Sequence, residues 1–380
     1  MKLLILNDCC TITAGQSPES RYYNYEGNGL PFFQGKADFG DLYPTIRVYC
    51  TQPIRIAEKD DILLSVRAPV GATNLSPCKV CIGRGLTAIR PNEKLTTKYL
   101  LYFFRFFEVQ LQQMGTGTTF KAITQKIVKS IEVPVPSLSE QERIVAHIEE
   151  LFSELDAGVE TLKKAKTQLD VYRQAVLKEA FEGNFDTGTI QTICQKIVDC
   201  PHSTPKWTKY GKICLRTTNF KRGYLDLTEK NFVSQQTFDE RNKRLIPLPG
   251  DILYSREGAI LGIACIIPDN LSVCLGQRMM LLRTNERMNN QFLMYYLNSP
   301  YLTNYVASIT GGSASPHINV KDIKDFYVPI PDINLQNIIV AYIASKMTVC
   351  DSIEQTIDAA LEQAKALRHS ILKEAFEGKL

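Results

Sequence analysis

The sequence lacks the motifs by which the common nucleotide-using and hydrolytic enzymes are recognised. None of the patterns G-x-x-x-x-G-K-[ST], G-x-G-x-x-G, H-E-x-x-H and G-x-S-x-G occurs in its 380 residues. The Asn-Pro-Pro-Tyr type of tetrapeptide expected of an adenine-N6 methyltransferase is also missing. These absences favour a binding protein over an enzyme, and we expect no catalytic residue on this chain.

Long apolar runs and clusters of metal ligands are missing as well. Arg105 interrupts the apolar stretch at 99–107, so no run reaches the roughly 18 residues that a membrane span needs. The first seven residues are too short for a secretory signal, so we expect a cytoplasmic protein with no membrane partner. The eleven cysteines are scattered and odd in number, which predicts reduced thiols. Cys78 and Cys81 form only half a zinc knuckle and the four histidines show no ligand spacing, so we expect no metal.

What the sequence does contain is an internal repeat. The heptapeptide at 177–183 returns letter for letter at 372–378, an offset of 195 residues. With the same offset and no gap, many residues between 123 and 165, among them Ile123, Gln141 and Asp156, are identical to their counterparts between 318 and 360. Further upstream the offset falls to 193 and then 190, which indicates small loop insertions in the second copy. Two copies of one long unit are usually held about a pseudo-twofold axis, which suits a two-part target or a symmetric partner.

Charge alternates along the chain in step with the repeat. Residues 1–136 and 186–331 each carry a net charge of +5, whereas residues 137–185 carry −4 and residues 332–380 carry −2. Two basic blocks suggest a polyanion held in two places, because phosphate neutralisation supplies most of the sequence-independent affinity for nucleic acids. The alternative is an ordinary protein surface, since this charge alone is not unusual for blocks of such length.

Each copy is predicted to be a mixed globule followed by one long helix. Short β-rich runs lie between Gly and Pro residues, at 45–50, 62–66, 252–255 and 263–267. Helices are expected around 98–109 and 290–297. The fold class is therefore α+β. Two pseudo-symmetric mixed globules are expected at residues 1–136 and 186–331, and the long helices that follow them at residues 137–185 and 332–380.

Local signals mark where the long helices begin and end. Residues 133–136 and 328–331 are expected to be extended, because a residue before proline is disfavoured in the α region. Ser139, with Glu142 three residues on, predicts a capping box, and Gly183 is expected to end the first helix in a left-handed C′ conformation. The second helix is expected to start after Asn334 and to end before Gly378.

Both predicted helices carry apolar residues at alternating spacings of three and four, which is a heptad seam. We expect the helices to pair as an antiparallel coiled coil. The alternative is two amphipathic helices that pack separately on their own globules. The seam residues are Ile144, Ile148, Leu151, Leu155, Leu162, Leu169, Tyr172 and Val176 in the first helix, and Ile339, Ile343, Ile353, Ile357, Leu367 and Ile371 in the second.

These marks resemble the specificity subunits of type I restriction-modification systems. The resemblance covers the whole chain, in the order target-recognition domain, helix, target-recognition domain, helix. It is carried by residues 133–144, 177–183 and 371–380, and in the second globule by residues 199–207, 215–219 and 250–256. The first globule matches more weakly, and Leu335 stands where the first helix has Glu140.

The resemblance implies a non-catalytic subunit that reads double-stranded DNA. Each globule would read one half of a bipartite asymmetric target, while the helices set the gap and dock two modification subunits. The modification subunits would supply S-adenosylmethionine and adenine methylation, and restriction subunits would cleave DNA with ATP and Mg, so no cofactor would belong to this chain. The residues alone leave two alternatives open, a protein-interaction scaffold with tandem ligand-binding globules and an enzyme with a degenerate motif.

Candidate DNA contacts are the loops where polar residues cluster beside glycine. Base edges are read by Arg, Lys, Asn and Gln, while Ser, Thr and backbone N–H groups hold phosphates. For each candidate a structural or merely solvated role is the alternative, and Trp207, the sole tryptophan, is expected to be a packed core residue rather than a wedge against DNA. The candidates are Arg67, Arg84, Thr118, Thr119 and Lys121 in the first globule, and His202, Lys206, Trp207, Arg216, Asn219, Lys221, Arg222, Arg256, Gln277, Arg278, Ser313, His317 and Asn319 in the second.

Overall fold

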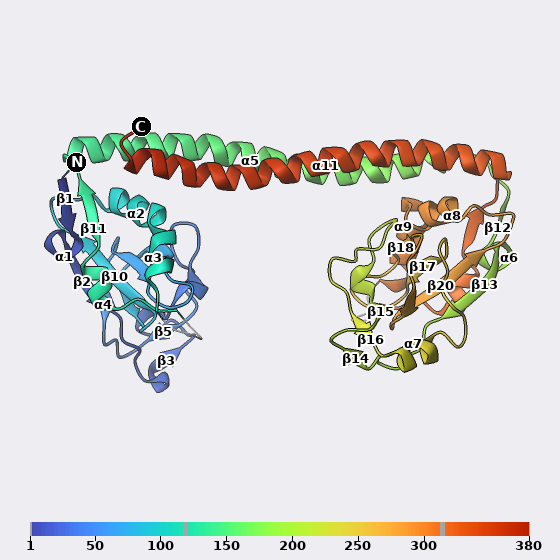
Figure 1. Ribbon diagram of the computed structural model, residues 1–380, viewed down its shortest axis with the longest axis horizontal. Helices are drawn as coiled ribbons and strands as arrows, with labels where there is room; N and C mark the ends of the chain where they lie inside the picture. The colour runs from blue at the N-terminus through green and yellow to red at the C-terminus, as the bar shows by residue number, and fades with distance from the viewer. Residues whose placement is uncertain (1, 117–120, 312–315, 380) are drawn as a thin grey trace. The chain divides into compact units, whose positions relative to one another are not determined.

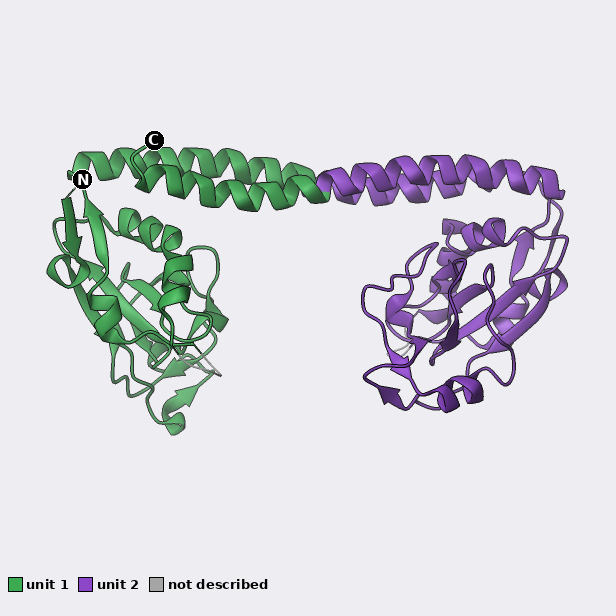
Figure 2. Cartoon of the chain, viewed as in Figure 1, with its two compact units in different colours: residues 1–162, 358–380 green, residues 163–357 purple. Residues whose placement is uncertain are grey.

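The computed structural model describes residues 2–116, 121–311 and 316–379. The chain forms two compact units (Figure 2), which we call unit 1 (residues 1–162 and 358–380) and unit 2 (residues 163–357). Two long helices, α5 (Leu138–Ala180) and α11 (Ile333–Phe376), are labelled in Figure 1, and the boundaries between the units fall inside both of them (Figure 2). Each unit therefore contains one globule and a segment of both helices.

The globule of unit 1 is a mixed α+β structure built on small sheets. A four-stranded sheet has the order β2-β10-β7-β8, a five-stranded sheet has the order β3-β5-β4-β9-β6, and β1 pairs with β11. The strands are β1 (Lys2–Ile5), β2 (Cys10–Ala14), β3 (Tyr23–Asn24), β4 (Leu30–Phe33), β5 (Tyr49–Cys50), β6 (Ile56–Ala57), β7 (Ile62–Ser65), β8 (Thr73–Leu75), β9 (Val80–Ile82), β10 (Leu86–Pro91) and β11 (Glu132–Val135). The helices are α1 (Leu6–Cys9), η1 (Ser20–Tyr22), η2 (Lys36–Asp38), α2 (Thr97–Phe106), α3 (Glu108–Met114) and α4 (Gln125–Lys129).

The globule of unit 2 repeats this plan. The sheet β13-β20-β17-β18 corresponds to β2-β10-β7-β8, the pair β12-β21 corresponds to β1-β11, and the sheet β14-β16-β15-β19 keeps one parallel pair, β15 with β19, as β4 pairs with β9. The strands are β12 (Thr187–Thr189), β13 (Cys194–Asp199), β14 (Trp207–Thr208), β15 (Lys212–Leu215), β16 (Phe232–Val233), β17 (Ile252–Ser255), β18 (Ala264–Ile266), β19 (Val273–Leu275), β20 (Met279–Thr284) and β21 (Tyr327–Pro329). The helices are α6 (Ile190–Ile193), η3 (Thr217–Asn219), α7 (Gln235–Arg241), α8 (Asn290–Leu297), α9 (Pro300–Thr310) and α10 (Val320–Lys324). The prediction of two mixed globules with long helices is confirmed.

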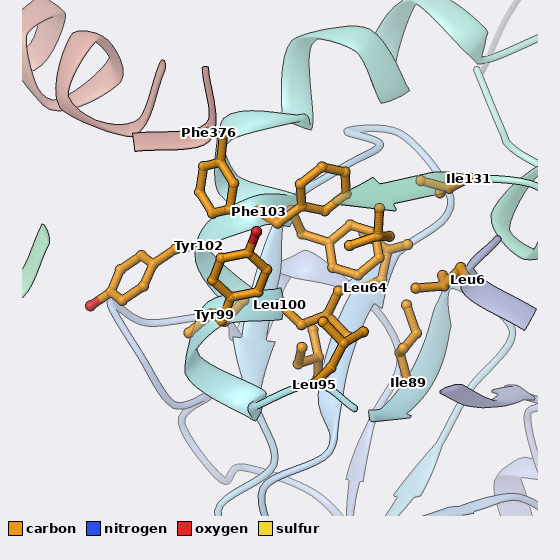
Figure 3. Close-up of a cluster of buried hydrophobic side chains, with 14 of the residues drawn as sticks. Leu6, Leu64, Ile89, Leu95, Tyr99, Leu100, Tyr102, Phe103, Ile131 and Phe376 are labelled. Atoms are coloured by element: carbon orange, nitrogen blue, oxygen red, sulfur yellow. The ribbon is translucent and has the colours of Figure 1, made fainter. Parts of the chain in front are cut away.

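The central sheet of each unit separates two hydrophobic cores. Side chains alternate across a strand, so Ile62 and Leu64 of β7 face the core under helix α2, shown in Figure 3, while Leu63 faces a smaller core on the other side. In unit 2, Ile252 and Leu253 of β17 divide between the two sides in the same way. Burial on both faces explains why these strands are apolar at every position but the last.

The repeated heptapeptide fixes the end of each long helix to a globule. Phe376 packs its ring against Tyr99 and Phe103 of α2, with centroids 5.2 and 5.7 Å apart (Figure 3). Phe181, which is 195 residues earlier, packs in the same way against the rings of Phe292 and Tyr296 of α8. The letter-for-letter repeat thus serves the same aromatic contact in both units.

A buried glutamine fixes the start of each long helix. The Gln141 amide donates to the carbonyls of Lys94 (2.8 Å) and Pro136 (3.0 Å), and its oxygen accepts from the Thr96 backbone N–H. Gln336 makes the same three bonds, to the carbonyls of Arg287 and Pro331 and from the N–H of Asn289. Both glutamines are fully buried. Because these bonds join the helix to the loop before α2 or α8, they fix the helix start to its globule.

The two long helices contact each other inside both units. In unit 2, Lys166 lies 3.2 Å from Glu354, and Arg173, two turns later in α5, reaches back to Asp351 in α11, so the helices run antiparallel. In unit 1, Arg368 pairs with Asp156 and lies over the ring of Phe152. The alternative in which each helix packs only on its own globule is therefore wrong.

The predicted seam residues differ in how far they are buried. Ile144, Ile148, Leu169, Val176, Ile343, Ile357 and Ile371 are buried, and Leu151, Leu155, Leu162 and Ile339 are partly buried. Tyr172, Ile353 and Leu367 do not behave as seam residues, because they are 47%, 45% and 50% exposed.

Several predicted boundaries need correction. Ser137, not Ser139, caps α5, since its Oγ accepts from the Glu140 N–H at 3.3 Å. Helix α11 starts at Ile333, one residue before Asn334, and the Oδ1 atom of Asp332 accepts from the N–H groups of Asn334 and Leu335. Both caps lie directly after the extended proline segment, so each helix begins at the first position that this segment allows.

Of the two predicted helix-ending glycines, one is confirmed and one is wrong, and one predicted strand is shorter than expected. Gly378 has φ +74°, and the Lys379 N–H donates to the Glu374 carbonyl, as expected at a helix C-terminus. Helix α5 ends at Ala180, three residues before Gly183, so Gly183 is not its C′ residue. Of the run at 45–50 only Tyr49–Cys50 is a strand.

Candidate nucleic-acid interface

Backbone hydrogen bonds bring several of the candidate loops of unit 2 together. The Arg256 N–H donates to the Arg278 carbonyl at 3.0 Å, and the Ile318 N–H donates to the Arg256 carbonyl at 2.9 Å. The Gly258 N–H donates to the Pro316 carbonyl at 3.1 Å, and the backbones of Glu257 and His317 form an isolated antiparallel β-bridge. The ends of β17 and β20 and the segment before α10 therefore lie at one edge of the globule.

Trp207, Arg216, Gln277 and Arg278 line one surface pocket together with Thr204, Pro205 and Thr217. The Arg216 guanidinium carbon lies 5.8 Å from the centroid of the Trp207 ring, which is a cation–π contact. Trp207 is 41% exposed, so the prediction that it packs in the core is wrong. Cations and an aromatic face around one depression match the groups that contact phosphates, base edges and base faces.

Arg278 stands in an unusual backbone conformation at this pocket. Its φ is +68°, in the left-handed region that is uncommon for residues other than glycine. Hydrogen bonds hold the neighbouring loop, because the Gln277 amide donates to the His202 carbonyl and its oxygen accepts from Thr204 Oγ1 at 3.4 Å. Strain of this kind persists only where the surrounding structure fixes it, and such positions concentrate at binding sites.

Arg256 supports the loops and is not available to DNA. It is buried, and its guanidinium donates to both carboxylate oxygens of Asp199, at 2.9 and 3.2 Å, and pairs with Glu257 at 2.7 Å. The exposed His202 places Nε2 3.1 Å from the same Asp199 carboxylate. Beneath them burial raises the pKa of the Cys200 thiol, which accepts from the Met279 N–H at 3.4 Å.

Asn219 also has a structural role instead of the predicted DNA contact. It is buried, its oxygen accepts from the Arg216 N–H at 2.9 Å, and its amide donates to the carbonyls of Asp226 and Glu229 at 3.0 Å. These three bonds close the loop that carries Arg216.

The other candidate residues of unit 2 lie away from the Trp207 pocket, bond to neighbouring residues, or stand next to the pocket without lining it. Lys221 and Arg222 line a different pocket, beside the long helices, whose walls include Asp351 and Glu354. The exposed Asn319 donates to Asp322 Oδ2 at 2.9 Å at the start of α10. Lys206 is exposed next to the Trp207 pocket, and Ser313 lies outside the described residues.

Unit 1 has the same backbone hydrogen bonds between its loops, which we call the loop frame, but it carries different side chains on them. The Val66 N–H donates to the Gly85 carbonyl and the Ile123 N–H to the Val66 carbonyl, both at 3.0 Å, as Arg256 and Ile318 do in unit 2. The backbones of Arg67 and Ala122 form an isolated antiparallel β-bridge, next to the exposed Lys121. The Arg84 N–H donates to Ser17 Oγ at 3.2 Å. Thr118 and Thr119 lie outside the described residues.

The repeat aligns three positions of the candidate loops with counterparts that carry another residue. Val66 stands where unit 2 has Arg256, Arg67 where it has Glu257, and Arg84 where it has Gln277. A common frame with different side chains is the arrangement expected of two surfaces that bind the same kind of partner at different sequences.

Sequence reasoning missed one buried residue, Arg241 at the end of α7. Its side chain contacts the candidate loops, yet it stands in the charged run 239–244, which is typical of a solvated surface. No local pattern marks its burial.

The described residues give no sign of a metal site or of a membrane segment. No three of their His, Cys, Asp and Glu side chains are grouped so as to hold a metal ion. Within residues 2–116, 121–311 and 316–379, no helix combines the length and the apolar character needed to cross a membrane.

The architecture defines a protein made of two equivalent globules, each with one cluster of polar and basic loops, and two shared helices. The family model for the type I restriction modification DNA specificity domain matches residues 2–167 and again residues 185–363. The chain therefore belongs to this family.

Individual relatives agree with the family match. The putative type I restriction enzyme MjaX specificity subunit of Methanocaldococcus jannaschii is 39% identical over 179 residues, which cover 47% of this chain and 41% of that protein. The type I restriction enzyme EcoBI specificity subunit of Escherichia coli is 25% identical over 315 residues, covering 73% and 65%. The matches thus span less than two thirds of the length of these two relatives. The EcoKI specificity subunit of Escherichia coli is 22% identical over 373 residues, covering 91% and 80%.

Solved structures share the fold. A chain from a structure of a type I R-M system has a TM-score of 0.74 at 21% identity, covering 100% of this chain and 98% of that one. The HsdS subunit from Thermoanaerobacter tengcongensis has a TM-score of 0.53 at 20% identity, covering 100% and 97%. At these identities the likeness establishes the fold and no residue roles.

Proposed function

We propose that this protein is the sequence-specific DNA-binding specificity subunit of a type I restriction-modification complex. Each globule reads one half of a bipartite, asymmetric double-stranded target, and the paired helices set the gap between the halves. The observation that carries the proposal is the repeated loop frame with substituted side chains, Val66, Arg67 and Arg84 in unit 1 against Arg256, Glu257 and Gln277 in unit 2.

The chemistry of the loops supports DNA as the ligand. In unit 2 the exposed Arg216 and Arg278 stand beside Trp207 and Gln277 in one pocket. Arg is the side chain that most often forms bidentate hydrogen bonds with guanine in the major groove, whereas the Gln277 amide already bonds to His202 and Thr204 and so shapes the pocket. The +5 charge of residues 1–136 and of residues 186–331 favours the phosphate backbone at both places.

In this proposal the chain performs no catalysis itself. Two modification subunits dock on the long helices and bring S-adenosylmethionine, and restriction subunits bring ATP and Mg. The acidic faces of α5 and α11 and their partly exposed apolar residues, such as Leu367, supply surfaces for helical partners. This chain then contributes recognition and spacing.

The test is binding of the purified chain, alone and with its modification subunits, to randomised duplex DNA at several salt concentrations. We expect selection of a split sequence and a steep fall of affinity with salt, because released counterions follow phosphate contacts. Enrichment of no sequence by the assembled complex would contradict the proposal. Retention of a protein or peptide instead of DNA would support an interaction scaffold.

A further inference from the structure

Arg241 is buried in unit 2, and the hydrogen bonds of its guanidinium to described residues go to backbone carbonyls and not to a carboxylate. It is 7% exposed, and its guanidinium donates to four backbone carbonyls, those of Leu275 (2.6 Å), Gly276 (2.8 Å), Ser203 (3.0 Å) and Pro201 (3.1 Å). Burial of a charge is costly unless its hydrogen bonds are satisfied. The planar guanidinium, with five N–H donors in a fixed fork, meets this arrangement of carbonyls where a lysine ammonium would not.

The four carbonyls lie in or directly before the two loops that carry the candidate DNA contacts, since Leu275 is the last residue of β19. Pro201 and Ser203 flank His202, and Leu275 and Gly276 come directly before Gln277 and Arg278. The two loops also meet through the Gln277 amide and the His202 carbonyl. Arg241 therefore ties together, from beneath, two loops that are more than 70 residues apart in the sequence.

We propose that Arg241 is a positioning residue for base recognition by unit 2. It fixes the distance between the two loops, so that the exposed Arg278 stands at the Trp207 pocket with its backbone geometry already set for a contact with DNA. The left-handed backbone of Arg278 needs such a restraint, because without it the residue would relax to an ordinary conformation. The inference rests on the proposed function and assigns no contact between Arg241 itself and DNA.

The test uses the complete complex with its modification subunits and compares Arg241→Met, Arg241→Lys and the control Lys243→Met. Lys243 is exposed two residues further on, and its replacement removes the same charge without removing the buried bonds. Methylation is measured on the preferred target and on targets with one changed base in either half-site. The half-site of unit 2 is the one that changes when residues 186–331 are exchanged.

We expect Arg241→Met to lower the preference for the correct base over a changed base at the half-site of unit 2 by about tenfold. This is near the lower end of the discrimination that one bidentate base contact supplies. Discrimination at the other half-site stays unchanged, and Lys243→Met behaves as wild type. Arg241→Lys is intermediate, because an ammonium group satisfies fewer of the four carbonyls. Hydrogen exchange at residues 201–207 and 275–279 rises in the same order.

Wild-type discrimination in a folded Arg241→Met complex overturns the inference, and so does an equal loss at both half-sites. If Arg241→Met does not fold, Arg241→Lys decides, because wild-type discrimination in that variant also overturns it. A wild-type complex that discriminates no sequence refutes the proposed function itself, so the two failures are distinguishable.

Discussion

Arg173 of helix α5 donates a hydrogen bond of 2.7 Å to Asp351 of helix α11, across 178 residues of sequence. The same guanidinium lies 2.9 Å from Glu354, which also pairs with Lys166 at 3.2 Å. Only 19% of the Arg173 side chain is exposed. This cluster joins the two long helices where they pass through unit 2, and the buried Cys350 directly precedes Asp351 in α11.

Replacing Arg173 with Met should loosen the helix pair in unit 2. The variant loses hydrogen bonds to two carboxylates, which we expect to cost about 1–2 kcal/mol of stability, since bonds to charged groups are worth somewhat more than neutral ones. Lys164→Met is the matched control, because Lys164 is exposed on the same helix. Thermal unfolding of both variants measures the effect, and equal melting temperatures would count against a stabilising cluster.

The cluster also predicts a dependence of stability on pH. Although burial acts to raise it, the pKa of Glu354 lies below its ordinary 4.5 because Arg173 and Lys166 donate hydrogen bonds to the carboxylate. A lowered folded-state pKa stabilises the protein above pH 4.5, and this contribution is lost as the pH falls through the folded value. Unfolding of wild type and Glu354→Gln from pH 6 to pH 3 should give melting temperatures that converge on acidification. A constant difference would refute the linkage.

The glutamines that fix the helix starts should be sensitive to substitution in both units. Gln141→Leu and Gln336→Leu each remove three hydrogen bonds and leave buried carbonyls unpaired, which should cost about 2–4 kcal/mol. Gln355→Leu is the control, because it makes the same chemical change at an exposed site of α11. Chemical denaturation compares the three variants. Stability equal to that of the control would mean that these bonds do not hold the helices.

The exposed arginines of unit 2 should differ in their effect on DNA. Arg278 lines the Trp207 pocket, whereas Arg222 lines the pocket beside the long helices. Arg278→Ala should weaken binding by about 1–3 kcal/mol and relax the sequence preference at one position. Arg222→Ala removes the same charge and should change affinity only slightly. Binding isotherms on the preferred target decide, and similar losses in both variants would place the DNA surface elsewhere.

The features that depend on periodicity and repetition were predictable from the sequence. The ungapped match at an offset of 195 predicted two equivalent units, and the seam predicted paired helices, whose contacts at Arg173 and Arg368 the structure provides. Residues before proline were correctly predicted as extended, because that restriction is local.

The roles of buried polar residues could not be predicted in the same way. Arg256 and Asn219 were expected at the DNA surface, and Arg241 was not singled out at all. Asp199, the hydrogen-bond partner of Arg256, lies 57 residues away in sequence, and the partners of Arg241 lie 34 to 40 residues away, so only the tertiary fold shows these bonds. The prediction for Trp207 was wrong in the opposite direction. An aromatic side chain favours burial, but Trp207 lines a surface pocket and is exposed.

The most direct test of the central claim, that each globule reads its own half-site, is an exchange of residues 186–331 for the second globule of a related specificity subunit. The junctions are suitable, because the Ile330 N–H donates to the Asp186 carbonyl at 2.7 Å and the ends of the exchanged segment are neighbours. The hybrid is co-expressed with its modification subunits, and adenine methylation is mapped at base resolution. We predict that one half of the methylated target changes while the other half and the gap stay the same. A change in both halves, or in neither, would contradict the account.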